Sequence, residues 1–328
     1  MVPNATILGG IAGTHLTAAE RDFFRAADPW GFILFGRNVD HPDQLRRLTG
    51  DLRDALGRDA VITVDQEGGR VQRLRGPHWT DWPAPMDQAA AGPRAMWLRY
   101  HLIGRELHAA GIDSNCAPTL DVAQADTHSF LRNRCLGADP ETVAILGRAS
   151  AEGMLAAGVL PVMKHMPGHG RALADSHHDL PTVTASEADL AALDFAPFRA
   201  LNDLPMGMTA HIRFTALDDA PATASPRMIG LIRDRIGFDG LLMTDDITMN
   251  ALSGTQADRA TASIAAGCDL VLHCNGTIAE MEPVVAAAGP MSEDAQRRAD
   301  AALAQRRPPQ DLDPRALMAE WRGLTRAA

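Results

Sequence analysis

The feature that most constrains the fold is a series of short apolar segments at regular intervals along the chain. Each is bounded by Gly, Pro or polar residues and followed by a stretch with helical spacing. The eight segments are 6–8, 31–35, 60–64, 112–117, 160–164, 206–210, 240–243 and 269–273. Apolar strands that alternate with helices are typical of a parallel sheet covered on both faces. Eight such units predict a single (β/α)₈ barrel, with a doubly wound open sheet as the alternative.

Helix start and stop signals between these segments favour the same architecture. Thr17 with Glu20 fits a capping box, Asp139-Pro140 and Ser225-Pro226 fit an N-cap followed by a first-turn proline, and Gly237 fits the position after a helix end. These local signals place helices where the barrel needs them.

The last part of the chain differs from the rest. Beyond about Pro283 it becomes Ala-rich and then marked by prolines, which predicts a connector and an outer amphipathic helix. We therefore expect one domain over 1–328, with a barrel core at about 5–280 and a C-terminal helical extension at about 283–328.

Composition and charge exclude several classes of function. With 31 Lys+Arg against 41 Asp+Glu, the net charge of −10 disfavours binding to nucleic acid or to anionic membrane surfaces. The first residues, MVPNATILGGIAG, lack the basic region of a secretory signal, and no window approaches the ~18 consecutive apolar residues of a spanning helix. The four cysteines lack CxxC spacing and are expected to be buried, reduced thiols. We expect a soluble, cytoplasmic, monomeric protein.

Polar side chains stand where the predicted strands end. They are Asp65, Asp121, Lys164, His165, His211, Asp245, Asp246 and Asn275. In a (β/α)₈ barrel the loops that follow the strands build the site, so polar ends on six of eight strands predict one shared pocket. The connections after Val64, Ala117 and Lys164 are long, which is usual for functional loops.

The segment KHMPGHGRALADSHHDLP (164–181) carries four of the twelve histidines. His165 and His169 are four residues apart, but a proline and a glycine between them prevent the regular helix of a zincin. Asp175 and His177 could form an acid–base pair on a loop, because a carboxylate can orient an imidazole and raise its pKa. A solvated turn fits these two residues equally well, and a metal centre with a third ligand from Asp175 or His177 is an alternative.

A pair of acids ends the apolar stretch GLLMTDDITM. Adjacent side chains at a strand end point in different directions, so Asp245 can face a pocket while Asp246 binds backbone. An ionised Asp at a rigid strand end suits nucleophilic attack on an anomeric carbon. Arg70, Arg73 and Arg134, on two of the long loops, could hold an anionic or hydroxyl-rich ligand.

Five segments together resemble glycoside hydrolase family 3. They are VDQEGGRVQR (64–73), NRCLG (133–137), KHMPGHG (164–170), ADSHHDLP (174–181) and LLMTDDITM (241–249). Within the family they most resemble the compact, one-domain β-N-acetylglucosaminidases of the NagZ type, over residues of about 5–280. The resemblance implies retaining hydrolysis of terminal, non-reducing β-linked N-acetylglucosamine through a covalent glycosyl-enzyme. It also implies a substrate from peptidoglycan recycling, GlcNAc-1,6-anhydro-MurNAc with or without its peptide.

The resemblance also implies the role of each matching residue. It makes Asp245 the nucleophile, His177 the acid–base group and Asp175 its partner, and it assigns sugar binding to Asp65, Arg73, Arg134, Lys164 and His165, with no metal and no cofactor. Thr244, Met166 and Cys135 stand where the family commonly has Ser, Phe and Ala, and none of these departures removes an assigned functional group.

Composition bears on the size of the substrate. Aromatic residues make up 5% of the chain, with one tyrosine, so the stacking rows of an extended polysaccharide cleft are not expected. A pocket for one or two sugar units fits better. Three alternatives stay open: a phosphorylase in which phosphate replaces water, a metal-dependent barrel hydrolase that uses His165, His169 and His177, and a catalytically silent sugar-binding barrel.

Overall fold

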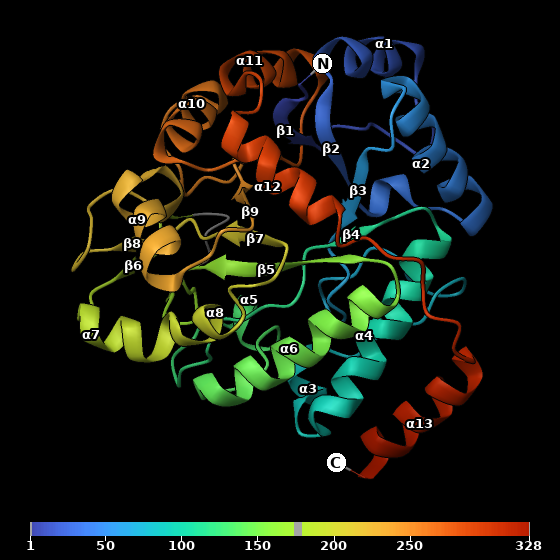
Figure 1. The fold of residues 1–328 in the computed structure, drawn as a ribbon, viewed down its shortest axis with the longest axis vertical. Helices are drawn as coiled ribbons and strands as arrows, with labels where there is room; N and C mark the ends of the chain where they lie inside the picture. Colours follow the sequence, from blue (N-terminus) through green and yellow to red (C-terminus); the bar gives the residue numbers. More distant parts are fainter. Residues whose placement is uncertain (1, 174–178, 328) are drawn as a thin grey trace.

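The computed structural model describes residues 2–173 and 179–327, and its centre is a closed barrel of eight parallel strands (Figure 1). In barrel order the strands are β1 (Asn4–Leu8), β10 (Leu270–His273), β9 (Leu241–Asp246), β7 (Met206–Thr209), β5 (Leu160–Met166), β4 (Ser114–Asn115), β3 (Val61–Val64) and β2 (Pro29–Leu34). Each predicted apolar segment supplies one strand. Because β1 pairs with both β2 and β10, the predicted barrel is confirmed and the open-sheet alternative is wrong.

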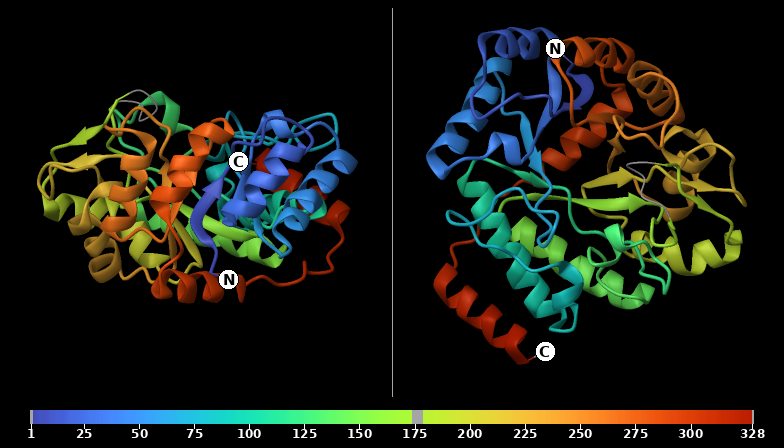
Figure 2. Two further views of the ribbon diagram at one scale, coloured as in Figure 1. Left: turned by 90° about the horizontal axis from the view of Figure 1, so that it is seen from above. Right: turned by 180° about the vertical axis from the view of Figure 1, so that it is seen from behind.

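A ring of helices surrounds the barrel, one after each strand (Figures 1 and 2). They are α1 (Ala18–Ala27), α2 (Pro42–Leu56), α4 (Gly92–Ala109), α6 (Pro140–Ala156), α8 (Ala196–Ala200), α9 (Pro226–Leu231), α10 (Gln256–Ala266) and α11 (Ile278–Ala288). Short helical pieces occupy the connections: α3 (Pro85–Ala89), α5 (Ser129–Arg132), α7 (Glu187–Asp189), η1 (Gly36–Asn38), η2 (Leu190–Asp194), η3 (Ala222–Ala224) and η4 (Ile232–Ile236).

Two further helices follow the last barrel unit. Helix α12 (Glu293–Leu303) contacts β9, and α13 (Pro314–Ala327) packs on the outside against α4. Figure 1 places the C-terminus beside α13, beyond the ring of helices. The predicted outer helix is therefore present, while the assignment of the whole chain to one domain stays a prediction.

The predicted helix caps are present. Thr17 and Glu20 form a reciprocal capping box at α1, the side chains of Asp139 and Ser225 accept hydrogen bonds at the starts of α6 and α9, and Gly237 has the left-handed φ of 79° after η4. Side-chain acceptors at these positions satisfy backbone N–H groups that have no partner within the helix.

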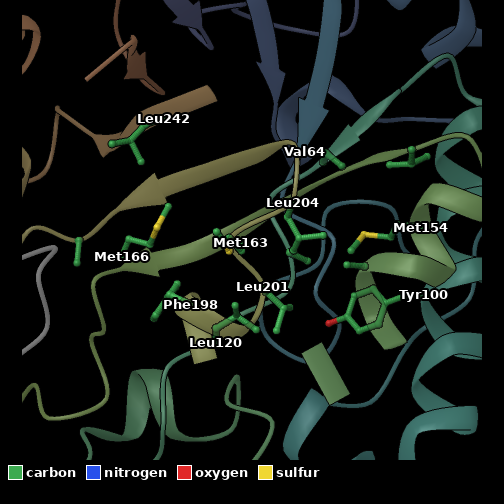
Figure 3. Packing of buried hydrophobic residues seen from close by; sticks show 14 of the residues in the cluster. Val64, Tyr100, Leu120, Met154, Met163, Met166, Phe198, Leu201, Leu204 and Leu242 are labelled. Carbon is green, nitrogen blue, oxygen red and sulfur yellow. The ribbon is translucent and has the colours of Figure 1, made fainter. Parts of the chain in front are cut away.

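The hydrophobic core has two large clusters because successive strand residues point to opposite faces, and a small third cluster contains Ala123, Leu131 and Cys135. On β2, Phe32 and Leu34 belong to the cluster that packs with the surrounding helices, whereas Ile33 belongs to the cluster that includes the barrel interior. Figure 3 shows the outer layer at β5, where Met163 and Met166 lie near Phe198 of α8. These apolar layers fix the strand ends from which polar side chains project.

Two loops at the carboxyl ends of the strands are joined to each other. Strand β6 (Thr182–Val183), after β5, pairs in parallel with β8 (Arg213–Phe214), after β7. The four cysteines are buried and free, as predicted. Within the described residues, no helix combines the length and the apolar composition that a bilayer crossing requires.

Candidate active site

A small cavity of ≈ 170 Å³ opens at the carboxyl ends of the barrel strands. Six of the eight predicted site residues line it: Asp65, Arg73, Arg134, Lys164, His165 and Asp245. The other two, Asp175 and His177, lie outside the described residues. Ligand pockets commonly measure about 300–1,000 Å³, so this smaller cavity has room for only a small ligand or one end of a larger one. The described candidates, predicted at strand ends and on the loops that follow them, therefore lie together around one cavity.

A buried network of charges forms one wall of this cavity. Lys164 Nζ lies 2.8 Å from Asp65 Oδ1 and 2.7 Å from Glu67 Oε1. Arg134 donates to both oxygens of Glu67 at 2.8 and 2.9 Å, and Arg73 Nη2 lies 3.1 Å from Asp65 Oδ2. Each cation of the network is therefore matched by a carboxylate.

Mutual attraction keeps these groups ionised. Burial alone would raise the pKa of Asp65, but Lys164 and Arg73 outweigh burial and hold that pKa well below its usual range. Burial also opposes ionisation of Glu67, yet Arg134 and Lys164 lower its pKa to about 2. Burial would lower the pKa of Lys164, but Asp65 and Glu67 raise it. The result is a fixed set of charged hydrogen-bonding groups, which suits sugar hydroxyls.

His165 is fixed from behind by Asp121, which follows β4. The His165 Nδ1 atom lies 2.7 Å from Asp121 Oδ2, and the backbone N–H groups of His165 and His169 donate to Asp121 Oδ1 at 3.3 and 2.7 Å. The other ring nitrogen, Nε2, lies 3.4 Å from Arg134 Nη2. Asp121 thus positions the imidazole without lining the cavity itself.

The two acids at the end of β9 have different surroundings. Asp246 accepts hydrogen bonds from the backbone N–H groups of Thr248 and Cys274, at 3.0 and 3.1 Å, so it secures the loop. Both acids line the cavity, but Asp245 accepts only the Asp246 N–H, at 2.8 Å, among the hydrogen bonds of the described residues. Burial would raise the pKa of Asp245, but His165 and His211 outweigh it and lower that pKa. An ionised carboxylate therefore faces the ligand space.

The remaining strand-end candidates take different positions. His211 is fully buried: its Nε2 lies 3.0 Å from the carbonyl oxygen of Asp246 and its Nδ1 2.8 Å from Thr223 Oγ1. It supports the acid pair from behind. Asn275 and Arg70 line the cavity, and Arg70 donates to the carbonyl oxygen of Phe130 at 2.7 Å.

His169 lines the cavity although only 2% of its surface is exposed. Its ring lies edge-on to His165, with centroids 5.7 Å apart, and neither ring nitrogen has a hydrogen-bond partner among the described residues. Burial, aided by the nearby His165, lowers the pKa of His169 to about 4. Over residues 2–173 and 179–327, no group of three potential ligands is placed to hold a metal ion.

The depressed pKa of His169 predicts a pH effect on stability. An unfolded histidine takes up its proton near pH 6.5, whereas folded His169 does so near 4, so folding is penalised progressively as pH falls between these values. The stability advantage of wild type over His169→Asn should shrink by about 3 kcal/mol from pH 7 to pH 4. Urea unfolding at several pH values measures the free energy of unfolding of both proteins. If the two free energies change with pH in parallel, the prediction is contradicted.

Sequence reasoning missed Glu67. It stands in the DQEGG stretch two residues after Asp65, yet it was given no role, because a glutamate beside two glycines is typical of an exposed turn. The only signal was its place inside a long loop that already contained three candidates, Asp65, Arg70 and Arg73. The apolar wall formed by Phe35, Met208 and Met249 also carried no signal beyond hydrophobicity.

The barrel and the pocket together define the class of protein. A (β/α)₈ barrel that aims an ionised carboxylate at a small cavity of paired charges is an enzyme scaffold suited to chemistry at a sugar. A family model described as the glycosyl hydrolase family 3 N terminal domain matches residues 18–303. The chain therefore belongs to glycoside hydrolase family 3, as the sequence predicted.

Individual relatives agree with this assignment. The chain is 38% identical to a β-hexosaminidase of Bordetella avium, over 84% of this chain and 82% of the relative. It is similar to a family 3 β-N-acetylglucosaminidase from a Paenibacillus species, with a TM-score of 0.89 and 30% identity, over 98% of this chain and 68% of that one. It is also similar to the NagZ of Neisseria gonorrhoeae, solved in complex with N-trifluoroacetyl-D-glucosamine. The TM-score is 0.84 and the identity 30%, over 99% of this chain and 97% of that one.

Proposed function

We propose that the protein is a retaining β-N-acetylglucosaminidase that removes terminal, non-reducing β-linked N-acetylglucosamine. The observation that carries the proposal is the ionised Asp245 facing a cavity lined by Asp65, Arg134 and Lys164. The names of the relatives, β-hexosaminidase and β-N-acetylglucosaminidase, support the same activity.

The reaction follows from these groups in two steps. Asp245 attacks the anomeric carbon to form a glycosyl-enzyme, while the leaving oxygen takes a proton from His177, which Asp175 orients. Water then gives a proton to His177 and attacks the same carbon, Asp245 departs, and the β configuration is restored. The roles of His177 and Asp175 rest on the family resemblance of their segment. Asp65, Arg134, Lys164 and His165 hold the hydroxyls of the terminal sugar.

The proposed substrate is GlcNAc-1,6-anhydro-MurNAc, with or without its peptide, from peptidoglycan recycling. The cavity of ≈ 170 Å³ supports recognition of one terminal sugar with the remainder of the substrate outside. The N-trifluoroacetyl-D-glucosamine in the Neisseria protein is a ligand of the same chemical kind. A monomer in the cytoplasm, as predicted from the sequence, suits this substrate, and cell fractionation with size-exclusion chromatography would test both points.

Water is the proposed acceptor in the second step. Lys164, Arg134 and Arg73 are each already paired with a carboxylate, which leaves Arg70 as the one cation of the described cavity lining without an ion pair to attract a phosphate ion. Added phosphate should therefore not accelerate the release of p-nitrophenol from p-nitrophenyl β-N-acetylglucosaminide. EDTA should not stop this release, because the proposed reaction uses no metal ion. Proton NMR should detect the β-anomer of N-acetylglucosamine first. Sugar 1-phosphate as the product would establish the phosphorylase, and loss of activity with EDTA the metal-dependent hydrolase.

The proposed role of His177 gives a distinct prediction. His177→Ala should lower kcat/KM by about 10²–10⁴-fold for a poor leaving group, since general acid–base catalysis contributes that much. For a leaving group that needs no proton, such as dinitrophenol, the first step should be much less affected. Steady-state kinetics with aglycones of graded acidity measures this dependence. An equal loss for every aglycone would contradict a proton-donating role.

A further inference from the structure

We propose that Glu67 is the positioning residue of the sugar pocket: it holds Arg134 and Lys164 in place and makes the pocket selective for uncharged sugars over anions. This inference rests on the proposed function for the identity of the ligand. Glu67 is buried completely and does not line the cavity, so it acts through the two cations that do.

Both carboxylate oxygens of Glu67 are occupied. Oε1 lies 2.7 Å from Lys164 Nζ and 2.8 Å from Arg134 Nη2, while Oε2 accepts from Arg134 Nε at 2.9 Å. The bidentate pairing fixes the plane of the guanidinium as well as its position. One side chain therefore sets the direction in which two sugar-binding cations present their remaining N–H groups.

The loop is built to bury this carboxylate. The backbone N–H of Glu67 donates to the Val71 carbonyl at 2.9 Å, and its carbonyl accepts from Arg99 Nη2 at 2.7 Å. The next residue, Gly68, has a φ of +103°, and a side chain there would collide with Arg99. Arg99 itself is completely buried on α4. The main chain thus holds Glu67 inward independently of any ligand.

Charge balance gives Glu67 its effect on selectivity. Four cations line the cavity: Lys164, Arg134, Arg73 and the exposed Arg70. Among the described ion pairs, Asp65 binds Lys164 and Arg73, and Arg70 has none. Among the described residues, Glu67 is the only carboxylate in an ion pair with Arg134. Without its charge, Arg134 would offer an unpaired guanidinium to the cavity, and guanidinium groups bind phosphate and sulfate strongly.

The test compares three variants of the full-length protein. Glu67→Gln keeps the shape and removes the charge, Glu67→Asp keeps the charge and shortens the reach, and Glu106→Gln is the matched control. Glu106 is a half-buried glutamate that accepts hydrogen bonds from Thr80 and Trp82 outside the pocket. The readouts are KM and kcat for p-nitrophenyl β-N-acetylglucosaminide, inhibition by inorganic phosphate, and calorimetric binding of phosphate, which needs no turnover.

We expect E67Q to raise KM by about tenfold or more with a smaller change in kcat, because ground-state binding and transition-state binding lose the same contacts. Phosphate should bind E67Q about tenfold more tightly than wild type, as an added charge-assisted contact predicts. E67D should raise KM but keep the phosphate affinity of wild type, and E106Q should match wild type in both.

Three outcomes would overturn the inference: E67Q with the KM and phosphate affinity of wild type, E67D with the tighter phosphate binding of E67Q, or E106Q with that same tighter binding. If E67Q does not fold, E67D decides, and an unchanged KM would overturn the inference. If wild type fails to cleave the glycoside, the proposed function fails, and phosphate calorimetry still decides whether Glu67 sets the charge of the pocket.

Discussion

Replacement of Asp245 by Asn should reduce kcat for p-nitrophenyl β-N-acetylglucosaminide by at least about 10³-fold, and by as much as about 10⁶-fold. Asn is nearly isosteric with Asp but has no anionic oxygen to form the ester with the anomeric carbon. Asp245 is 8% exposed, and its single described hydrogen bond comes from the neighbouring backbone, so the change should cost little stability. Steady-state kinetics and thermal unfolding measure the two effects.

Asp246→Asn is the matched control for this prediction. Asp246 binds Thr248 and the backbone of Cys274, so its amide variant should lose stability first and activity only secondarily. A large fall in kcat for Asp246→Asn at an unchanged Tm, with Asp245→Asn still active, would mean that Asp246, and not Asp245, is the nucleophile.

Replacement of Lys164 by Met should destabilise the protein by about 3–5 kcal/mol, the usual cost of removing one partner from a buried ion pair. Lys164 is 2% exposed and contacts Asp65 and Glu67, so its removal leaves the buried Glu67 and the half-buried Asp65 with one cation fewer. Because Lys164 also lines the cavity, kcat/KM should fall by about 10²-fold or more. Urea unfolding and steady-state kinetics measure the two losses.

Arg148→Met provides the comparison for the stability loss. Arg148 pairs with Asp203 at the surface, with side chains 32% and 64% exposed, and such pairs contribute about 0–1 kcal/mol. Equal stability losses for the two variants would mean that the network around Lys164 does not behave as a buried ion pair.

The barrel could be predicted from the sequence because its signal is local. Each of the eight apolar segments carries its own bounding residues, and the caps at Thr17, Asp139 and Ser225 need only their neighbours. The position of the pocket could be predicted from the topology, since all parallel strands end on the same face of the barrel. That rule brought Asp65, Lys164 and Asp245 together across 180 residues of chain.

The remaining features of the site depend on contacts between distant loops. Glu67 becomes important only because Arg134, from the loop after β4, and Lys164, from β5, converge on it. The pKa of His169 follows from burial, which the sequence PGHG does not reveal. The different tasks of Asp245 and Asp246 were expected as a possibility, but the partner of Asp246 at the end of the neighbouring strand β10, Cys274, was not.

The most direct test of the mechanism is to trap the glycosyl-enzyme. A fluorinated N-acetylglucosaminyl fluoride loads a retaining enzyme faster than the product is released, so the covalent intermediate accumulates. Mass spectrometry of the intact protein and of its proteolytic peptides should find one sugar attached, on the peptide that contains Asp245. A sugar on another residue, or turnover of the natural glycoside with inversion and no label, would contradict a double displacement at Asp245.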